Sequence, residues 1–279
     1  MSELLSLIRA GAKPVIGMVQ LRPLPGSSRY RGGHINEILD EALSEARVLS
    51  DHDVDALMVQ NLGDLPVAAR AAPAQIAWMT RVVAEARRIG RPVGLNLLEN
   101  DAEAMFAVAS GAGADFVRIK VYVGAMATPF GIESGQAFAA IRARNACDAS
   151  HVAIFADVHD RTGVPMASGG FAEDAEFAIR LGGADGLVLT GKGYGQTLAF
   201  IDAARKCIGA APILVGGGVN AKNFAEVDRV ADGVIVSSSL KDSNDSFGRL
   251  AAAKVQAFME EVRRVRSEMG ASVGTKEVA

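Results

Sequence analysis

Short apolar runs alternate with longer amphipathic segments along most of this chain. The runs contain few polar residues, which is typical of strands that are buried on both faces of a parallel sheet. The segments between them repeat apolar residues every three or four positions, which predicts helices. Eight runs fit strands, at residues 15–21, 54–59, 92–97, 114–119, 152–158, 184–189, 212–215 and 231–236.

An internal repeat supports this division of the chain. Four of the predicted strands begin with a small or apolar residue followed by aspartate, at Asp55, Asp115, Asp185 and Asp232. Because these aspartates come where strands begin, we interpret them as structural and not as catalytic groups. A strand followed by a helix, repeated eight times, predicts an α/β fold, a single (β/α)8 TIM barrel over residues 1–268.

The two ends of the chain lie outside this repeat. Leu4 to Ile8 precede Gly11 and Pro14, which predicts a short helix within residues 1–13 that packs on the barrel. A last helix is expected from Phe247 to Glu268, and residues 269–279 are expected to form a flexible tail. The segment 124–135 lacks helical spacing and is interpreted as a lid with glycine hinges.

Glycines and serines end the last two predicted strands. Gly216, Gly217 and Gly218 follow the seventh run, and Ser237, Ser238 and Ser239 follow the eighth. In barrels of this type the loops after strands 7 and 8 often bind phosphate through backbone N–H groups and a helix N-terminus. We therefore predict a standard phosphate-binding site here. The alternative is that the glycines only form a tight turn.

The overall charge narrows the classes of partner. Lysine and arginine total 29 against 32 acidic residues, a net charge of −3, which does not favour nucleic acid as a partner. No apolar run predicts a transmembrane segment. Cys147 and Cys207 have neither disulfide-framework nor zinc spacing, so a cytoplasmic protein is expected.

Polar residues follow the ends of the predicted strands, where barrel active sites form. Alternation along the strands directs a set of these side chains toward one mouth: Gln20, Gln60, Asn61, Asn96, Arg118, Lys120, Asp157, His159, Thr190 and Lys192. So many hydrogen-bonding groups at one end would each lose solvation without a partner, which favours a ligand site.

Asp157 and His159 are candidates for proton transfer because they stand two positions apart, on one side of a strand. They also fit two metal ligands, but the chain has only four histidines, so no zinc site is predicted. No cofactor is required, and Mg²⁺ held by Asp157 and a substrate phosphate is left open. The alternative for His159 is a loop histidine bonded to Asp160.

Lys120 and Lys192 allow two interpretations. A lysine in a barrel mouth can form a Schiff base with a keto sugar, or it can remain a charged counter-ion beside phosphate. Together with Asn96, either lysine would stabilise negative charge on a substrate oxygen.

Several motifs together resemble one protein family. They are GMVQLRPLPGS from Gly17, NLGD from Asn61, NLLEND from Asn96, GAM from Gly124 and SSLK from Ser238. The chain from about residue 15 to 259 resembles the BtpA/SgcQ family, which implies a phosphate-binding barrel. That family is associated with photosystem I accumulation, and other members accompany sugar-uptake and sugar-kinase genes.

The chain also departs from the family pattern. The family usually has histidine at position 20, glutamate at 60 and a lysine–histidine pair at 161 and 162, where this chain has Gln20, Gln60, Arg161 and Thr162. Each change removes a group that titrates or binds metal, which indicates a different substrate or reduced activity if those positions carry the family's chemistry. Asp157, His159, Asn96, Asn61 and the phosphate loops match.

Two functions follow as hypotheses. The first is an enzyme that acts on a small phosphorylated sugar or nucleoside by removing a proton next to a carbonyl, as an isomerase, epimerase or aldol-type lyase. The second is a non-enzymatic assembly factor, or a protein that binds a phosphorylated metabolite without turnover. A homo-oligomer is expected in either case.

Overall fold

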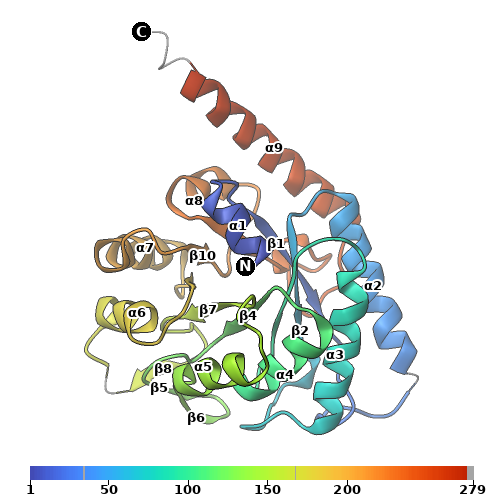
Figure 1. Ribbon diagram of the computed structural model, residues 1–279. Coiled ribbons are helices and arrows are strands. Elements are labelled where there is room, and N and C mark those ends of the chain that lie inside the picture. Colours follow the sequence, from blue (N-terminus) through green and yellow to red (C-terminus); the bar gives the residue numbers. More distant parts are fainter. Residues whose placement is uncertain (34, 167, 275–279) are drawn as a thin grey trace.

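The eight predicted runs form eight parallel strands that close into a barrel, so the predicted fold class is confirmed (Figure 1). The computed structural model describes residues 1–33, 35–166 and 168–274. Around the barrel the strands follow the order β1-β11-β10-β9-β7-β4-β3-β2. Their bounds are β1 (Val15–Gln20), β2 (Ala56–Gln60), β3 (Val93–Asn96), β4 (Phe116–Ile119), β7 (Ala153–Asp157), β9 (Gly186–Leu189), β10 (Ile213–Val215) and β11 (Gly233–Val236).

A ring of helices covers the outside of the barrel. In Figure 1 the helices α2 to α8 follow one another around the strands, and α9 extends away from the ring. Their bounds are α2 (Ile35–Asp51), α3 (Pro73–Arg87), α4 (Ala102–Ala112), α5 (Ala137–Ala146), α6 (Phe171–Arg180), α7 (Tyr194–Ile208) and α8 (Phe224–Val230), with short 3-10 helices η1 (Leu62–Asp64) and η2 (Ser238–Leu240). Helix α4 has local start and stop signals, because Asp101 caps its first turn and Gly113 ends it in the left-handed region.

The barrel interior has its own apolar core, and helix α1 (Glu3–Arg9) closes its floor. Leu4 and Leu5 are buried among the residues that fill the barrel, including Met58, Phe116 and Phe155. Asp115 fixes the start of α1, because its carboxylate accepts hydrogen bonds from the Ser2 hydroxyl at 2.7 Å and from the Leu4 N–H at 2.9 Å. Helix α1 thus packs against the barrel interior.

The repeated aspartates join neighbouring strands at their beginnings. Three of the four accept a hydrogen bond from the backbone N–H of an adjacent strand's first residues: Asp55 from Val15 at 2.8 Å, Asp185 from Ile154 at 2.9 Å and Asp232 from Ile213 at 2.7 Å. Arginines on the outer helices pair with the same carboxylates. Their structural role, predicted from the repeat, is confirmed.

The segment 124–135 is a β-hairpin. It contains β5 (Ala125–Thr128) and β6 (Gly131–Ser134), and β5 also pairs with β8 (Val164–Met166), which follows β7. The three strands form an antiparallel sheet beside the barrel mouth. Met126 and Glu133 are opposite one another on one face of this sheet, whereas Ala127 and Ile132 are on the other.

The C-terminal part differs from the expectation. Helix α9 begins at Ala252 and continues to Gly274. The residues before it form a turn closed by a bridge between Lys241 and Leu250, which keeps Phe247 outside the helix. The expected tail therefore begins inside α9, and residues 275–279 lie outside the described part of the chain.

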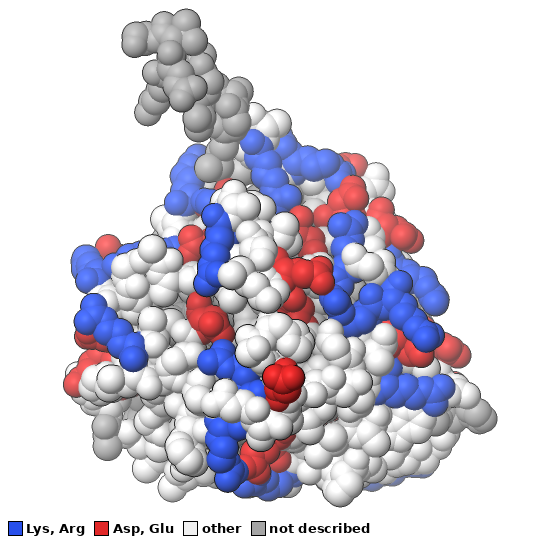
Figure 2. All heavy atoms as spheres, viewed as in Figure 1, with Lys and Arg blue, Asp and Glu red and all other residues white. Residues whose placement is uncertain are grey.

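Charged side chains of both signs are interspersed on the face seen in Figure 2. Within the described residues, no helix is long and apolar enough to cross a membrane.

Candidate active site

One cavity of about 290 Å³ lies at the carboxyl ends of the barrel strands. Most of the side chains predicted for the mouth line it, as do the glycine and serine loops. The predicted residues in its lining are Gln20, Gln60, Asn96, Arg118, Lys120, Thr190, Gly216, Gly217, Gly218, Ser237 and Ser238. The residues Asn61, Asp157, His159, Lys192 and Ser239 are not part of the lining.

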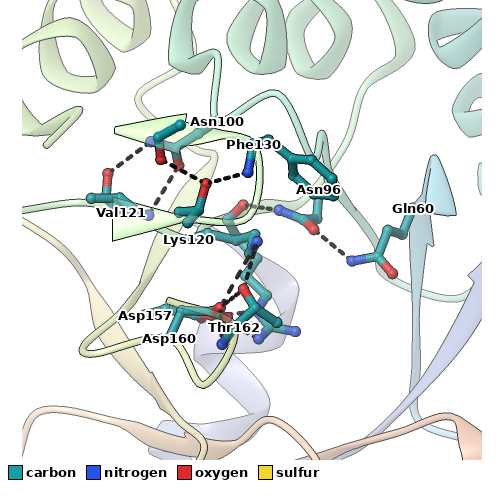
Figure 3. A network of polar contacts seen from close by, with 12 residues as sticks. Gln60, Asn96, Asn100, Lys120, Val121, Phe130, Asp157, Asp160 and Thr162 are labelled. Carbon is teal, nitrogen blue, oxygen red and sulfur yellow. Dashed lines mark hydrogen bonds and ion pairs between the residues drawn. The ribbon is translucent and has the colours of Figure 1, made fainter. Parts of the chain in front are cut away.

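A chain of hydrogen bonds links the ends of five strands along one side of the cavity. The Ser237 hydroxyl donates to Gln20 Oε1 at 3.0 Å, and Gln20 Nε2 donates to Gln60 Oε1 at 3.5 Å. Gln60 Nε2 donates to Asn96 Oδ1 at 2.6 Å, and Asn96 Nδ2 donates to the Arg118 carbonyl at 2.8 Å (Figure 3). These amides do not titrate, so Gln20 and Gln60 orient one another and transfer no protons.

Arg118 and Asp157 form a buried ion pair at the end of this chain. Arg118 Nε donates to Asp157 Oδ1 at 2.8 Å, and its NH2 donates to Oδ2 at 2.7 Å. Burial raises the pKa of the Asp157 carboxyl, and the guanidinium opposes this change. Since both carboxylate oxygens face Arg118, Asp157 holds the guanidinium in the cavity wall.

Asn61 belongs to a buried network beside the cavity. Its Nδ2 donates to Asp64 Oδ2 at 2.8 Å and to Glu99 Oε2 at 2.9 Å, and Gln75 Nε2 donates to the same two carboxylates. Burial raises the pKa of Glu99, and the hydrogen bonds from Asn61 and Gln75 oppose this rise. The NLGD and NLLEND segments therefore meet in a structural cluster that fixes the loops after β2 and β3.

His159 points away from the cavity. Its φ of 54° ends the extended backbone of β7, and its ring packs edge-on against Phe171 and Phe200. Nε2 lies 2.7 Å from Asp174 Oδ2 on α6. The alternative bond to Asp160 does not form. Because Asp157 accepts from Arg118 and His159 pairs with Asp174, the two residues do not form a proton-transfer pair with each other.

The two lysines have different surroundings. Lys120 lines the cavity, with Nζ 3.8 Å from Asp160 Oδ1 and 3.4 Å from the Thr162 hydroxyl (Figure 3). Lys192 is exposed in the loop before α7 and does not line the cavity. Of the two, Lys120 is the one placed to contact a ligand there.

The three glycines after β10 have distinct roles. The Gly216 N–H donates to the Leu189 carbonyl at 3.0 Å, and a Cβ at this position would lie 2.4 Å from Val188 Cγ1. Gly218 has φ of 77°, in the left-handed region that favours glycine. In the described residues, the N–H groups of Gly217 and Gly218 have no protein acceptor, so both are available to an anion at the cavity wall.

The serines after β11 divide in the same way. Ser238 lines the cavity at the N-terminus of η2, and Ser237 also lines it while its hydroxyl donates to Gln20. The Ser239 hydroxyl instead donates to the Val219 carbonyl at 2.8 Å, which joins this loop to the glycine loop. The two predicted phosphate loops are thus adjacent.

The lining also includes residues that were not proposed from the sequence as ligand-contacting groups, among them Phe130, Glu133, Asp160 and Arg161. Phe130 and Glu133 come from the β5–β6 hairpin, and the other two follow β7. Lys120 and bonds from Thr162 hold the pKa of Asp160 below its usual range despite burial. Alternation in the hairpin would have directed the apolar Ile132 inward, but Ile132 is exposed and Glu133 lines the cavity, so the local sequence held no signal for Glu133.

The donor set does not fit a metal at Asp157. Both of its oxygens are held by Arg118, and the described residues contain no cluster of three or more His, Cys, Asp or Glu side chains suited to a metal ion.

The closed parallel barrel, with its cavity at the carboxyl ends of the strands, places this chain in the class of TIM-barrel proteins. The solved structure of tryptophan synthase from Mycobacterium tuberculosis has this fold at 14% identity, with a TM-score of 0.62 over 95% of this chain and 98% of that one. The chain belongs to the BtpA family, whose model matches residues 11–264.

Two relatives illustrate the range of the family. The photosystem I biogenesis protein BtpA of Synechocystis is 36% identical over 251 residues, 88% of this chain and 87% of its own length. The putative sgc region protein SgcQ of Escherichia coli is 27% identical over 258 residues, 91% of this chain and 96% of its own length. The family resemblance seen in the sequence motifs is confirmed.

Proposed function

We propose that this protein is an enzyme that acts on a small phosphorylated metabolite, a sugar or nucleoside phosphate, by removing a proton next to a carbonyl group. The observation that carries the proposal is one cavity lined by two kinds of group. Gly217 and Gly218 contribute backbone N–H groups without a protein acceptor among the described residues, and Lys120, Asp160 and Glu133 contribute charged side chains.

Each kind of group has a separate role in this proposal. The two N–H groups, the Ser238 loop and the guanidinium of Arg161 bind the phosphate dianion. Lys120 stabilises the negative charge that develops on the substrate's carbonyl oxygen when the neighbouring carbon loses its proton. The amide chain from Gln20 to Asn96 holds the substrate's hydroxyl groups in place.

A thermal-shift screen tests this function. Phosphorylated sugars and nucleotides are compared with their unphosphorylated counterparts, with and without Mg²⁺. A ligand at about one hundred times its Kd stabilises by about 2.7 kcal/mol, which raises Tm by about 5–10 °C for a domain of this size. Stabilisation by phosphorylated compounds alone is expected, and no stabilisation by any of them would contradict the proposal.

A second candidate function is a non-enzymatic assembly factor, as the name of the Synechocystis relative suggests. The observation that favours it is an apolar face on the hairpin sheet, where Ile132 is 68% and Val164 59% exposed. Phe138 and Leu181, on the neighbouring α5 and after α6, are also exposed. Apolar surface of this kind is typical of a protein contact.

Sedimentation of the wild type, of Ile132→Asp and of Phe247→Asp separates two uses of this face. Phe247 is an exposed apolar residue outside it and serves as the control. We expect a homo-oligomer that only Ile132→Asp dissociates, which assigns the face to a subunit contact. If the wild type is a monomer, the apolar face is available to bind a different protein, which would favour the assembly-factor function.

A further inference from the structure

Two carboxylates line the cavity within the described part of the chain, Glu133 and Asp160. The other polar side chains of the lining are amides, hydroxyls, Lys120 and two arginines. A base that removes a proton next to a carbonyl is most simply a carboxylate or a histidine, and His159 faces α6. Proton transfer in this cavity therefore depends on which carboxylate is available.

The carboxylate of Asp160 already has partners within the protein. Its Oδ1 accepts a hydrogen bond from the Thr162 N–H at 2.9 Å and another from the Thr162 hydroxyl, and Lys120 Nζ lies 3.8 Å away. These contacts lower its pKa and keep it ionised. Asp160 is thereby suited to holding Lys120 charged and in position, and poorly suited to accepting a proton.

Glu133 has the opposite surroundings. It is on the inward face of β6, opposite Met126, and its Oε2 is inaccessible to solvent without a hydrogen-bond partner among the described residues. Burial raises its pKa, Lys120 and the Thr128 side chain oppose the rise, and Asp160 adds to it. Two carboxylates with pKa values shifted in opposite directions in one cavity are a common arrangement of an acid–base residue and a fixed charge.

The hairpin that carries Glu133 is anchored on both sides. The Gly135 N–H donates to the Gly124 carbonyl at 2.7 Å, and β5 pairs with β8 along its length. Asn100 on the barrel side exchanges two hydrogen bonds with the backbone of Val121, just before the hairpin. Glu133 is thus held at a defined place in the cavity wall.

We propose that Glu133 is the acid–base residue of this cavity and that the ligand is a phosphate ester with a carbonyl or hydroxyl group next to Lys120. This inference rests on the proposed function, since the phosphate fixes the ligand relative to Glu133.

The reaction step needs no oxidant, reductant or co-reactant. The Glu133 carboxylate takes a proton from the carbon next to the carbonyl, the C–H electron pair becomes the C=C bond of an enediolate, and the carbonyl electron pair moves onto the oxygen beside Lys120. When the carbon that loses its proton carries a hydroxyl group, Glu133 returns the proton to the former carbonyl carbon, and the hydroxyl proton passes to the oxygen beside Lys120. The first carbon then becomes the new carbonyl, which completes an isomerisation.

Glycidol phosphate tests this assignment without knowledge of the natural substrate. Its phosphate occupies the loop site, and a correctly placed carboxylate opens its epoxide: a carboxylate oxygen bonds to the epoxide carbon, the C–O bond of the ring breaks, and the freed oxygen takes a proton from water or Lys120. Mass spectrometry of the digested protein locates the resulting ester.

The variants are Glu133→Gln and, as a matched control, Glu260→Gln on the exposed face of α9. We expect one label on Glu133 in the wild type and in the control, and suppression of the label by inorganic phosphate. In Glu133→Gln the labelling rate falls about 100-fold or more, while inorganic phosphate still raises Tm. In the wild type the rate increases with pH as Glu133 ionises, which a purely structural carboxylate would not cause.

Four results overturn the inference, and three of them leave the proposed function intact. Labelling of Asp160, or an unchanged rate in Glu133→Gln, assigns the role elsewhere and leaves the proposed function intact. Stabilisation by inorganic phosphate without any label on Glu133 has the same meaning. If neither inorganic phosphate nor glycidol phosphate changes Tm or labels the protein, the proposed function fails and this inference fails with it.

Discussion

Alanine substitutions at the three consecutive glycines after β10 should separate folding from phosphate binding. At Gly216 the new Cβ would lie 2.4 Å from Val188 Cγ1 and 2.5 Å from Thr190 Oγ1, within the packed strand end. Overpacking of this kind costs about 1–3 kcal/mol of the free energy of unfolding. The Gly216 N–H already donates to Leu189, so phosphate affinity should be unchanged in Gly216→Ala.

Gly217→Ala should give the reverse result. The nearest atom to its Cβ is Thr190 Cγ2 at 3.3 Å, a slightly tight side-chain contact, so the free energy of unfolding falls by about 1 kcal/mol or less. The added methyl lies between Thr190 and Arg161, at the cavity wall. Alanine keeps the backbone N–H, but its methyl group holds the phosphate away from it. Loss of this charge-assisted hydrogen bond, worth about 1.5–3 kcal/mol, weakens binding about 10- to 150-fold.

Gly218→Ala completes the series, because its φ of 77° costs an alanine about 1–2 kcal/mol of stability without a steric contact at Cβ. Urea unfolding measures stability and isothermal titration with inorganic phosphate measures affinity for all three variants. If Gly217→Ala loses as much stability as Gly216→Ala, or binds phosphate like the wild type, the assignment of these glycines is wrong.

Three further variants test other parts of the structure. The raised pKa of Glu133 means that the folded state keeps the Glu133 proton to higher pH than the unfolded state does, so the contribution of Glu133 to stability declines as pH increases above about 4.5. Glu133→Gln should therefore become more stable relative to wild type between about pH 4.5 and 7.5, as measured by urea unfolding. A constant difference in stability between the two proteins would contradict this. Glu99→Gln places an amide nitrogen against the Asn61 or Gln75 side-chain amide, so the free energy of unfolding should fall by about 1–3 kcal/mol while phosphate affinity stays unchanged. An unchanged free energy of unfolding would show that this hydrogen-bond network does not stabilise the fold. Leu4→Ala should cost about 2–5 kcal/mol in the same assay, whereas a loss below about 1 kcal/mol would show that α1 does not close the barrel floor.

The barrel was predictable because its strands are buried on both faces. Runs such as Ile213 to Val215 contain no polar residue, so their pattern differs sharply from that of the helices around them. The aspartates that begin strands added a second, independent signal, because three of the four accept a hydrogen bond from the backbone N–H of the adjacent strand.

The site was predictable only as far as strand alternation extends. Gln20, Gln60 and Asn96 end their strands and reach the cavity, as alternation predicts. His159 lies beyond the last residue of β7, where its positive φ turns the chain and the ring leaves the mouth.

The sequence did not predict Glu133 as a site residue for a different reason. Each strand of its hairpin has four residues, which is too short for a reliable hydrophobic pattern, and an isolated glutamate resembles a solvated surface residue. Only the pairing with β8, which depends on residues far along the chain, determines which face of the hairpin meets the barrel.

The pairing of β5 with β8 also bears on how this family can diversify. In most TIM barrels each loop at the mouth can change alone, because each belongs to its own strand and helix. Here the loop after β4 and the loop after β7 each contribute to one sheet. The loop after β4 carries Glu133 and the loop after β7 carries Asp160, so the position of each residue depends on both loops. Grafting only one of these loops from a relative should therefore disturb both, and the two segments 120–135 and 158–166 form a single unit of inheritance and of design.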